Sequence, residues 1–418
     1  MNIAQVFQSS DGDATAQMSH RPGLRMLPSV MLLTNARVVT PAGVREAGWV
    51  RIAGDRISGV GSGPPPPDAP KCHELGGRWL VPGFIDLHVH GGGGHAMLTS
   101  DPAEIRSAAS FHRVHGTTRS LASIVSAPFE EMLAGVAAVR DVVRAGTTSD
   151  GHIMGSHLEG PFLHPRRCGA HDPRHLLTPD LAAFDQLLDA ADGTLRVITL
   201  ASELPGGLDL VRHAVAAGVI VAVGHSDADH ARAMTAFDAG ASLVTHLFNG
   251  MRPFHHRLPG LVGAALAHPG VVCEIINDGV HLHDATARVA FQAAGSPRIA
   301  LVTDAIAAAG AGDGEFQLGS ATVLVRDGEV RLAGGETLAG STLTMDVAVR
   351  RAVRMLGLPI TAAVDAASAT PARLLGIGDR VGTIEPGRQA DLVVLSDDLE
   401  VEAVMAAGEW TTSARLIS

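Results

Sequence analysis

Between residues 79 and 306, short apolar runs alternate with stretches of helical length, such as 129–145 and 227–240. The apolar runs are nearly continuous, which is typical of strands that are buried on both faces of a parallel sheet. Eight such units predict an α/β fold, a parallel (β/α)₈ TIM-like barrel. A doubly wound open sheet is the competing hypothesis, but it usually has fewer strands and a glycine fingerprint after the first. The predicted strands are residues 79–90, 116–126, 151–160, 195–202, 218–226, 241–249, 271–281 and 298–305.

The flanking segments have a different pattern. Apolar and polar residues alternate over 31–63, 321–334 and 381–410, with glycine and proline between the runs, which predicts antiparallel strands. We therefore expect the two chain ends to meet in one small β-sandwich beside the barrel. Residues 341–377 are expected to be helical, with Ser341 as the cap. The predicted organisation is a disordered extension over 1–30, sandwich parts over 31–80 and 376–418, and the barrel over 81–375.

Composition narrows the class of protein. Hydrophobic residues make up 46% of the 418 residues and charged residues 18%, as in a globular chain. The formal net charge of −11 argues against a nucleic-acid surface, and no apolar run reaches the roughly 20 residues that span a bilayer. Three widely separated cysteines fit a reducing compartment, and residues 1–30 lack the pattern of a signal peptide. We expect a cytoplasmic protein with no nucleic-acid or membrane partner.

Polar residues recur at the ends of the predicted barrel strands. In a barrel the carboxyl ends of all strands point to one mouth, where active sites are built. Residues i and i+2 of a strand share a face, so the two histidines of the first strand can approach one point. Imidazole and carboxylate together suit zinc or iron in a mixed nitrogen and oxygen site. The candidates are His88, His90, Glu159, His225, His246 and Asp304.

Each candidate also has a simpler interpretation. A single histidine at a strand end is usually a packed or solvated residue. Glu159 could be a loop carboxylate, and Asp304 could cap a helix that begins at "AIAAAG". Six such residues, each at the same end of a predicted strand, favour a shared metal site.

Several motifs carry a resemblance to a known family. "PGFIDLHVHG" resembles the opening motif of the amidohydrolase superfamily. The later motifs resemble its N-acetylglucosamine-6-phosphate deacetylase branch, in the expected order over residues 31–410. "LEGPF" and "HHRxPG" separate this branch from other amidohydrolases. The motifs are "HLEGPF" (157–162), "GAH" (169–171), "GHS" (224–226), "THLFNGM" (245–251), "HHRLPG" (255–260), "DGVH" (278–281) and "LVTDA" (301–305).

The lysine content supports the same branch. Many binuclear amidohydrolases bridge their metals with a carboxylated lysine on a barrel strand. Here the only lysine is Lys71, which precedes the barrel, so a carboxylate must serve instead. Glu159 is placed to do so.

The resemblance implies a role for each matching residue. Glu159, His225 and His246 would bind the principal metal, and His88 and His90 would help to hold a second ion with Glu159. Asp304, also a candidate ligand, would act as general base and then general acid, while His171 would polarise the acetyl carbonyl. Arg257 would bind the phosphate, in its own site or in that of a neighbouring subunit. The residues expected to contact the sugar or its phosphate are Asn249, Gly250 and His281.

These roles predict the hydrolysis of N-acetylglucosamine 6-phosphate to glucosamine 6-phosphate and acetate by a homodimer. The expected cofactor is a divalent metal, zinc before iron, cobalt or manganese, with one or two ions per subunit. N-acetylgalactosamine 6-phosphate and an unphosphorylated N-acetyl sugar remain alternative substrates. A cyclic-amide hydrolase or deaminase, or a non-catalytic binding protein on the same fold, agrees less well with the phosphate-loop motif and the complete ligand set.

Overall fold

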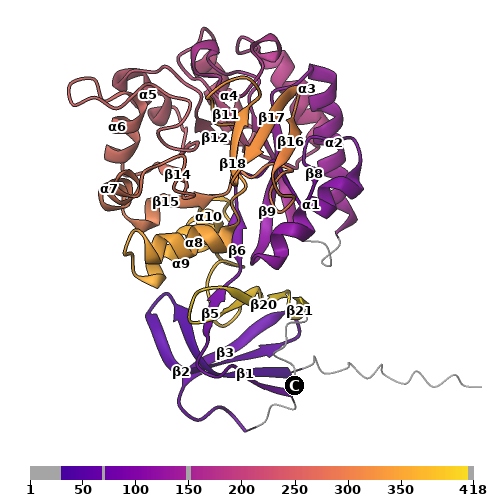
Figure 1. Cartoon of the computed structure of the whole chain (residues 1–418), viewed down its shortest axis with the longest axis vertical. Coiled ribbons are helices and arrows are strands. Elements are labelled where there is room, and N and C mark those ends of the chain that lie inside the picture. The colour runs from indigo at the N-terminus through magenta and orange to yellow at the C-terminus, as the bar shows by residue number, and fades with distance from the viewer. Residues whose placement is uncertain (1–29, 68–70, 147–151, 413–418) are drawn as a thin grey trace, which may run out of the picture.

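The structure is a computed structural model of the whole chain, and it describes residues 30–67, 71–146 and 152–412. The extension predicted for residues 1–30 lies outside these ranges except for Val30. A parallel barrel forms the centre of the molecule, and a sheet made from both chain ends lies below it (Figure 1).

Eight parallel strands form the barrel, in sequence order around the sheet from β6 to β15. All eight strands predicted from the apolar runs are present, which confirms the barrel prediction. Their side chains are almost entirely buried, because the strands lie between the barrel interior and the outer helices. The strands are β6 (Phe84–Asp86), β9 (Thr117–Val125), β10 (His152–Glu159), β11 (Leu195–Leu200), β12 (Ile220–Val223), β13 (Leu243–Val244), β14 (Val272–Ile276) and β15 (Ile299–Val302).

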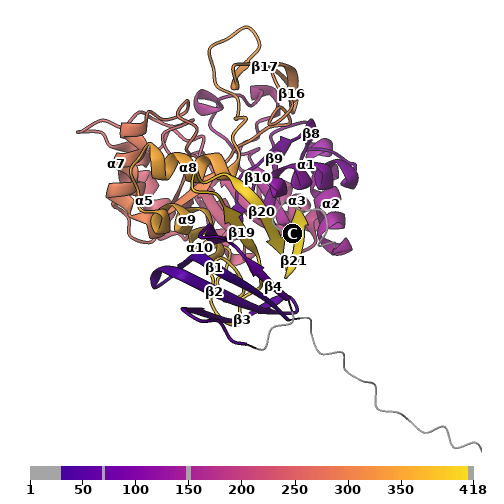
Figure 2. The same ribbon diagram turned by 60° about the horizontal axis from the view of Figure 1, so that its bottom comes forward.

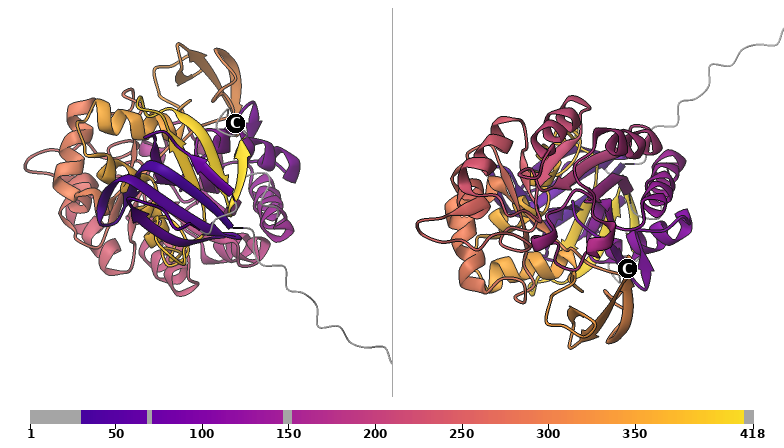
Figure 3. Two further views of the ribbon diagram at one scale, coloured as in Figure 1. Left: turned by 90° about the horizontal axis from the view of Figure 1, so that it is seen from below. Right: turned by 90° about the horizontal axis from the view of Figure 1, so that it is seen from above.

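Helices surround the strands, as the two views of Figure 3 show. They pack on the strands with one apolar face. In α2, for example, the buried Met132, Val136 and Val139 follow the helical repeat and lie on one side. The helices are α1 (Pro102–Val114), α2 (Phe129–Ala145), α3 (Leu181–Ala191), α4 (Gly207–Ala216), α5 (His230–Asp238), α6 (Gly260–Ala267), α7 (Asp284–Ala294), α8 (Met345–Arg354), α9 (Ile360–Ala367) and α10 (Ala369–Leu374). Short 3₁₀ turns lie at Pro165–Arg167, Pro173–His175 and Ser296–Arg298.

Two helix predictions can be compared directly with these bounds. The predicted helix 129–145 coincides with α2, and 227–240 contains α5. The expected cap at Ser341 is wrong, because α8 begins at Met345 with Thr344 in the N-cap position. The Ser341 hydroxyl instead donates to the Thr303 carbonyl at 2.6 Å, so it joins this segment to the end of a barrel strand.

The barrel closes between its first and last strands at the mouth. The Asp304 N–H donates to the His88 carbonyl at 2.8 Å, and the His90 N–H donates to the Ala305 carbonyl at 2.7 Å. Below them the Thr303 hydroxyl donates to Asp86 Oδ2 at 2.6 Å. The segments that carry His88, His90 and Asp304 are therefore tied to one another directly.

The two chain ends meet, as expected, and their strands form one eight-stranded sheet where a β-sandwich was predicted. Its order is β21-β20-β19-β5-β1-β2-β3, with β4 also paired to β1. Most pairs are antiparallel, and only β1 with β4 and β1 with β5 run parallel. The strands are β1 (Val30–Thr40), β2 (Gly43–Ala53), β3 (Arg56–Ser62), β4 (Lys71–Glu74), β5 (Trp79–Pro82), β19 (Leu392–Leu395), β20 (Val401–Ala406) and β21 (Glu409–Thr412).

Residues 321–334 form antiparallel strands, as predicted, but the expectation that these strands belong with those of the chain ends is wrong. They lie in a separate antiparallel sheet of β16 (Gly314–Leu318), β17 (Ala321–Arg326) and β18 (Glu329–Leu332). Figure 2 shows this sheet at the edge of the barrel, away from β1–β4. Alternation of apolar and polar residues predicts a strand but not its partner, and this is the physical reason for the error. A short pair, β7 (Gly91–Gly92) and β8 (His95–Ala96), completes the strands.

None of the helices in the described ranges combines the length and the apolar character that a membrane span requires.

Candidate metal centre and active site

Six predicted residues lie together at the mouth of the barrel. His88 and His90 follow β6, Glu159 ends β10, and His225, His246 and Asp304 each lie two residues beyond a strand. All six side chains are buried. They form two groups of three whose potential ligand atoms lie within 4.8 Å of one another.

The first group, here the glutamate cluster, consists of Glu159, His225 and His246. Glu159 Oε1 lies 3.0 Å from the Nε2 atoms of both histidines. Those two Nε2 atoms are themselves 3.0 Å apart. Two imidazole nitrogens and one carboxylate oxygen converge on one point, which is the donor set of a divalent metal site with open positions.

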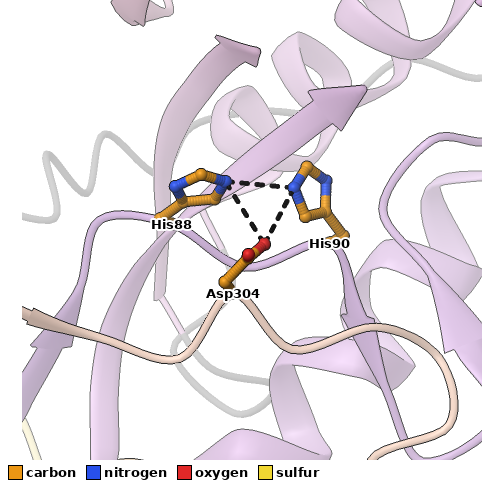
Figure 4. A group of neighbouring side chains, drawn as sticks. All are labelled: His88, His90 and Asp304. Atoms are coloured by element: carbon orange, nitrogen blue, oxygen red, sulfur yellow. Dashed lines mark hydrogen bonds and ion pairs between the residues drawn. The ribbon is translucent and has the colours of Figure 1, made fainter. Parts of the chain in front are cut away.

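The second group, here the aspartate cluster, consists of His88, His90 and Asp304 (Figure 4). The two Nε2 atoms are 3.1 Å apart. Asp304 Oδ1 lies 3.4 Å from His88 Nε2 and 3.3 Å from His90 Nε2. Both rings therefore turn their Nε2 atoms toward the carboxylate, as Figure 4 shows.

Glu159 also faces the aspartate cluster. Its second oxygen, Oε2, lies 3.1 Å from His90 Nε2 and 3.5 Å from His88 Nε2. One oxygen thus faces each cluster, which is the geometry that a bridging carboxylate requires.

Three of the six residues have unusual backbone conformations. The φ angles of His225, His246 and Asp304 are 46°, 26° and 50°, in the left-handed region that favours glycine. Such conformations cost on the order of 1–3 kcal/mol each and persist where the surroundings impose them. Gly250 accommodates one of these bends, because a Cβ atom there would lie 2.8 Å from His225 Nδ1. The fold thus holds these side chains in place at an energetic cost.

Positive charge in the two clusters stabilises the ionised forms of Glu159 and Asp304. Burial alone would raise the pKa of Glu159, but His88 and His171 hold it well below its ordinary range. Burial also opposes ionisation of Asp304, yet His88 and His90 lower its pKa to about 2. Conversely, burial would lower the pKa of His90, but Asp304 and Glu159 raise it to about 9. A divalent cation supplies the same positive charge and displaces the protons from the imidazoles, so the donor set fits a metal.

His171 lies beside the glutamate cluster and is neutral. Its Nε2 lies 3.2 Å from Glu159 Oε2, and its Nδ1 accepts a hydrogen bond from the Ser126 N–H at 3.3 Å. Because Nδ1 is an acceptor, the ring proton must be on Nε2. Burial lowers the pKa of His171 to about 4. His171 therefore presents a neutral N–H donor toward the centre.

A cavity of about 220 Å³ opens onto both clusters. Its wall includes Asn249, Gly250 and His281, as predicted for the substrate site. Burial would lower the pKa of His281, but Asp278, whose Oδ2 lies 2.7 Å from its Nδ1, raises that pKa. The contact with Asp278 fixes the orientation of the His281 ring in the wall.

Arg257 is not brought into this cavity. It does not belong to the cavity wall, and its guanidinium contacts His256 Nε2 at 2.8 Å on the exposed loop before α6. The neighbouring Phe254 and Leu258 are 54% and 65% exposed. Among the residues that form the wall there is no arginine or lysine.

Sequence reasoning missed one side of the cavity. Leu318, Thr337, Leu338 and Gly340 line it from β16 and from the segment after β18. These residues follow no barrel strand and match no motif, so nothing in their pattern indicated a site. Gly340 has a structural reason to be glycine. Its φ is 69°, and a Cβ atom there would lie 3.0 Å from the Asp304 carbonyl oxygen.

Comparison with known proteins identifies the family. The model described as "Amidohydrolase family" matches residues 79–411, which is most of the chain. The chain belongs to the amidohydrolase family. Family membership and the two clusters together indicate a divalent metal.

Relatives of this amidohydrolase include sugar-phosphate deacetylases. The N-acetylglucosamine-6-phosphate deacetylase of Bacillus subtilis is 36% identical over 381 residues, which cover 90% of this chain and 96% of that protein. The N-acetylgalactosamine-6-phosphate deacetylase of Escherichia coli is 36% identical over 378 residues, covering 90% of this chain and 98% of that protein.

A solved structure is also similar. It is that of a mutant N-acetyl-D-glucosamine-6-phosphate deacetylase from Mycobacterium smegmatis in complex with N-acetyl-D-glucosamine-6-phosphate. The sequences are 43% identical, the TM-score is 0.87, and the match covers 92% of this chain and all of that one (100%). The resemblance inferred from the motifs is confirmed.

Proposed function

We propose that this amidohydrolase removes the acetyl group of N-acetylglucosamine 6-phosphate, giving glucosamine 6-phosphate and acetate. One observation carries the proposal: Glu159 presents one oxygen to each of two ligand clusters, and Asp304 and His171 face the same cavity. Relatives that are named for this activity, and that match most of the chain, support the proposal.

Asp304 is suited to move the proton. Its low pKa leaves it ionised in the resting site, so it can accept a proton from the attacking water. The same carboxyl group then returns that proton to the amide nitrogen, which leaves as an amine when the C–N bond breaks. The products are acetate and the free amino sugar, and the carboxylate is regenerated.

His171 is suited to polarise the carbonyl. A neutral imidazole with its proton on Nε2 can donate to the carbonyl oxygen as negative charge develops there. Glu159, His225, His246, His88, His90 and Asp304 would hold the metal, which when bound supplies Lewis acidity that activates water and stabilises the oxyanion. We propose zinc, since the donor set mixes imidazole and carboxylate, with one or two ions per subunit.

Asn249, Gly250 and His281 would contact the sugar or its phosphate from the cavity wall. Arg257 would bind the phosphate from a neighbouring subunit, because in its own subunit it lies outside the wall on an exposed loop. This role implies a homodimer, and the exposed Phe254 and Leu258 beside Arg257 offer apolar surface for such a contact. We also propose a cytoplasmic location, supported by free Cys72, Cys168 and Cys273.

N-acetylgalactosamine 6-phosphate is the second candidate substrate. The Escherichia coli relative named for that substrate is as similar as the Bacillus subtilis relative, each being 36% identical. The two sugars differ only in the configuration of one ring hydroxyl, so the same catalytic residues would act on both. An unphosphorylated sugar, a cyclic amide and a purely binding role have no comparable support.

Acetate release from a panel of substrates tests the proposal. The zinc-loaded protein is assayed with N-acetylglucosamine and N-acetylgalactosamine, each with and without the 6-phosphate. We expect the highest kcat/KM with N-acetylglucosamine 6-phosphate. A higher value with the galactosamine analogue would select the second candidate, and an equal value with the unphosphorylated sugars would refute phosphate recognition.

A further inference from the structure

Glu274 is a buried carboxylate that the proposed mechanism does not use. It lies in β14 between Cys273 and Ile275, and its exposure is 0%. Burying a carboxylate among apolar side chains is costly unless specific hydrogen bonds compensate. Its contacts therefore indicate why the fold contains it.

One oxygen of Glu274 contacts both ligand clusters. Oε2 lies 3.1 Å from His88 Nδ1 and accepts a hydrogen bond from the His246 N–H at 3.2 Å. The first contact reaches the aspartate cluster and the second reaches the glutamate cluster. In the described part of the chain, Oε1 has no hydrogen-bond partner.

The contact with His88 fixes the tautomer of that ring. A carboxylate oxygen can only accept, so in this contact the Nδ1 of His88 carries the proton and donates it to Oε2. The lone pair is then on Nε2, which faces His90 Nε2 at 3.1 Å and Asp304 Oδ1 at 3.4 Å. This is the orientation that a ligand of the aspartate cluster needs.

The other candidate ligands have weaker outer partners. His90 Nδ1 lies 3.2 Å from the Ser123 carbonyl and His225 Nδ1 lies 2.7 Å from the Arg167 carbonyl. His246 Nδ1 has no partner among the described residues. Only His88 among these four rings has a carboxylate behind it, and a carboxylate partner raises the basicity of a metal-binding imidazole more than a carbonyl does.

We propose that Glu274 is a positioning residue that sets the affinity of the aspartate cluster for its metal ion, and so decides whether this enzyme holds two ions. The inference rests on the proposed metal-dependent function. Glu274 acts through His88 and touches neither the cavity nor the substrate.

Metal content tests the proposal. The wild-type protein, Glu274→Gln and a control variant are stripped of metal, titrated with zinc and analysed for bound zinc after dialysis. Glutamine has the same shape and can still accept from both N–H groups, but it has no charge. We expect the wild type to bind two zinc ions. In Glu274→Gln, the affinity for one ion should be unchanged, and the affinity for the other should fall about 10- to 100-fold.

Ser368→Ala is the matched control. Ser368 is also fully buried, and its hydroxyl donates to the Val364 carbonyl at 2.6 Å, away from the candidate ligands. This control variant should have a lower Tm, but its affinities for both zinc ions should equal those of the wild type. If Glu274→Gln does not fold, zinc titration of the wild type against His90→Ala still counts ions in the aspartate cluster.

In the His90→Ala background, where that cluster has lost a ligand, Glu274→Gln should have no further effect on zinc content. Unchanged zinc binding in Glu274→Gln, or a single ion in the wild type, would overturn the proposal. Wild-type acetate release is measured in parallel. Two ions without acetate release would refute the proposed function alone, whereas acetate release with an unchanged Glu274→Gln titration would refute this inference alone.

Discussion

Glu159 is the residue on which the site depends, because each of its oxygens faces a different set of histidines. Oε1 lies 3.0 Å from His225 Nε2, and Oε2 lies 3.1 Å from His90 Nε2. With Lys71 as its single lysine, the chain has no lysine on a barrel strand to carboxylate. A glutamate at the end of β10 occupies the position between the clusters instead.

At the residue scale, the first prediction concerns Asp304→Asn. Asparagine keeps an oxygen toward His88 and His90 but cannot accept the proton of water or pass it to the amine. We expect turnover to fall by about 10²- to 10⁴-fold while metal content stays near that of the wild type. Metal analysis and acetate release on the same preparation check this. Full activity, or an equal loss of metal and turnover, would contradict the role of Asp304.

At the scale of elements, the sequence predicted the positions of strands, because these depend on the local pattern of apolar and polar residues. The eight strands were predicted from their apolar runs, and the polar residues at the ends of those runs led to all six candidate ligands. Residues 321–334 were placed in the wrong sheet, since partner choice depends on tertiary contacts. Leu318 and Glu274 could not be assigned either, because each looks like an ordinary strand residue until the neighbouring strands are known.

Helix α1 contributes a buried histidine whose titration can be measured. His112 Nε2 donates to the Gly91 carbonyl at 2.8 Å, which joins α1 to β7. Burial lowers the pKa of His112 from 6.5 to about 4. Between pH 6.5 and about pH 4, His112 is protonated in the unfolded chain but neutral in the folded chain. The free energy of unfolding therefore falls as the pH falls from 6.5 toward 4.

The prediction compares wild type with His112→Gln, which retains a donor but does not titrate. Between pH 7.5 and pH 5, the wild type should lose about 2 kcal/mol more of its unfolding free energy than the variant. Urea unfolding at both pH values measures the difference, and loss of metal at low pH affects both proteins alike. Equal pH dependence would show that His112 is not held neutral.

At the scale of the whole molecule, distant parts of the chain complete the site. The cavity wall combines barrel strand ends with Leu318 and Leu338 from the β16–β18 region, and Arg257 lies on an exposed loop outside it. The sheet of the chain ends lies beneath the barrel and contributes no residue to the wall. Phosphate recognition by Arg257 therefore requires a second subunit in our proposal.

Arg257→Ala tests that arrangement. We expect KM for N-acetylglucosamine 6-phosphate to rise about 10-fold or more, because a charge-assisted contact with the phosphate is lost, and KM for N-acetylglucosamine to change little. Arg232→Ala, an exposed arginine on α5, is the control and should leave both values unchanged. An identical effect of Arg257→Ala on both sugars would argue against a phosphate contact.

The central claim is metal-dependent deacetylation at the two clusters. The most direct measurement is acetate release from N-acetylglucosamine 6-phosphate by the metal-free protein during stepwise addition of zinc. We predict no release without metal, and with zinc one acetate for each glucosamine 6-phosphate formed. Release that does not depend on metal, or none from the fully zinc-loaded protein, would contradict the account.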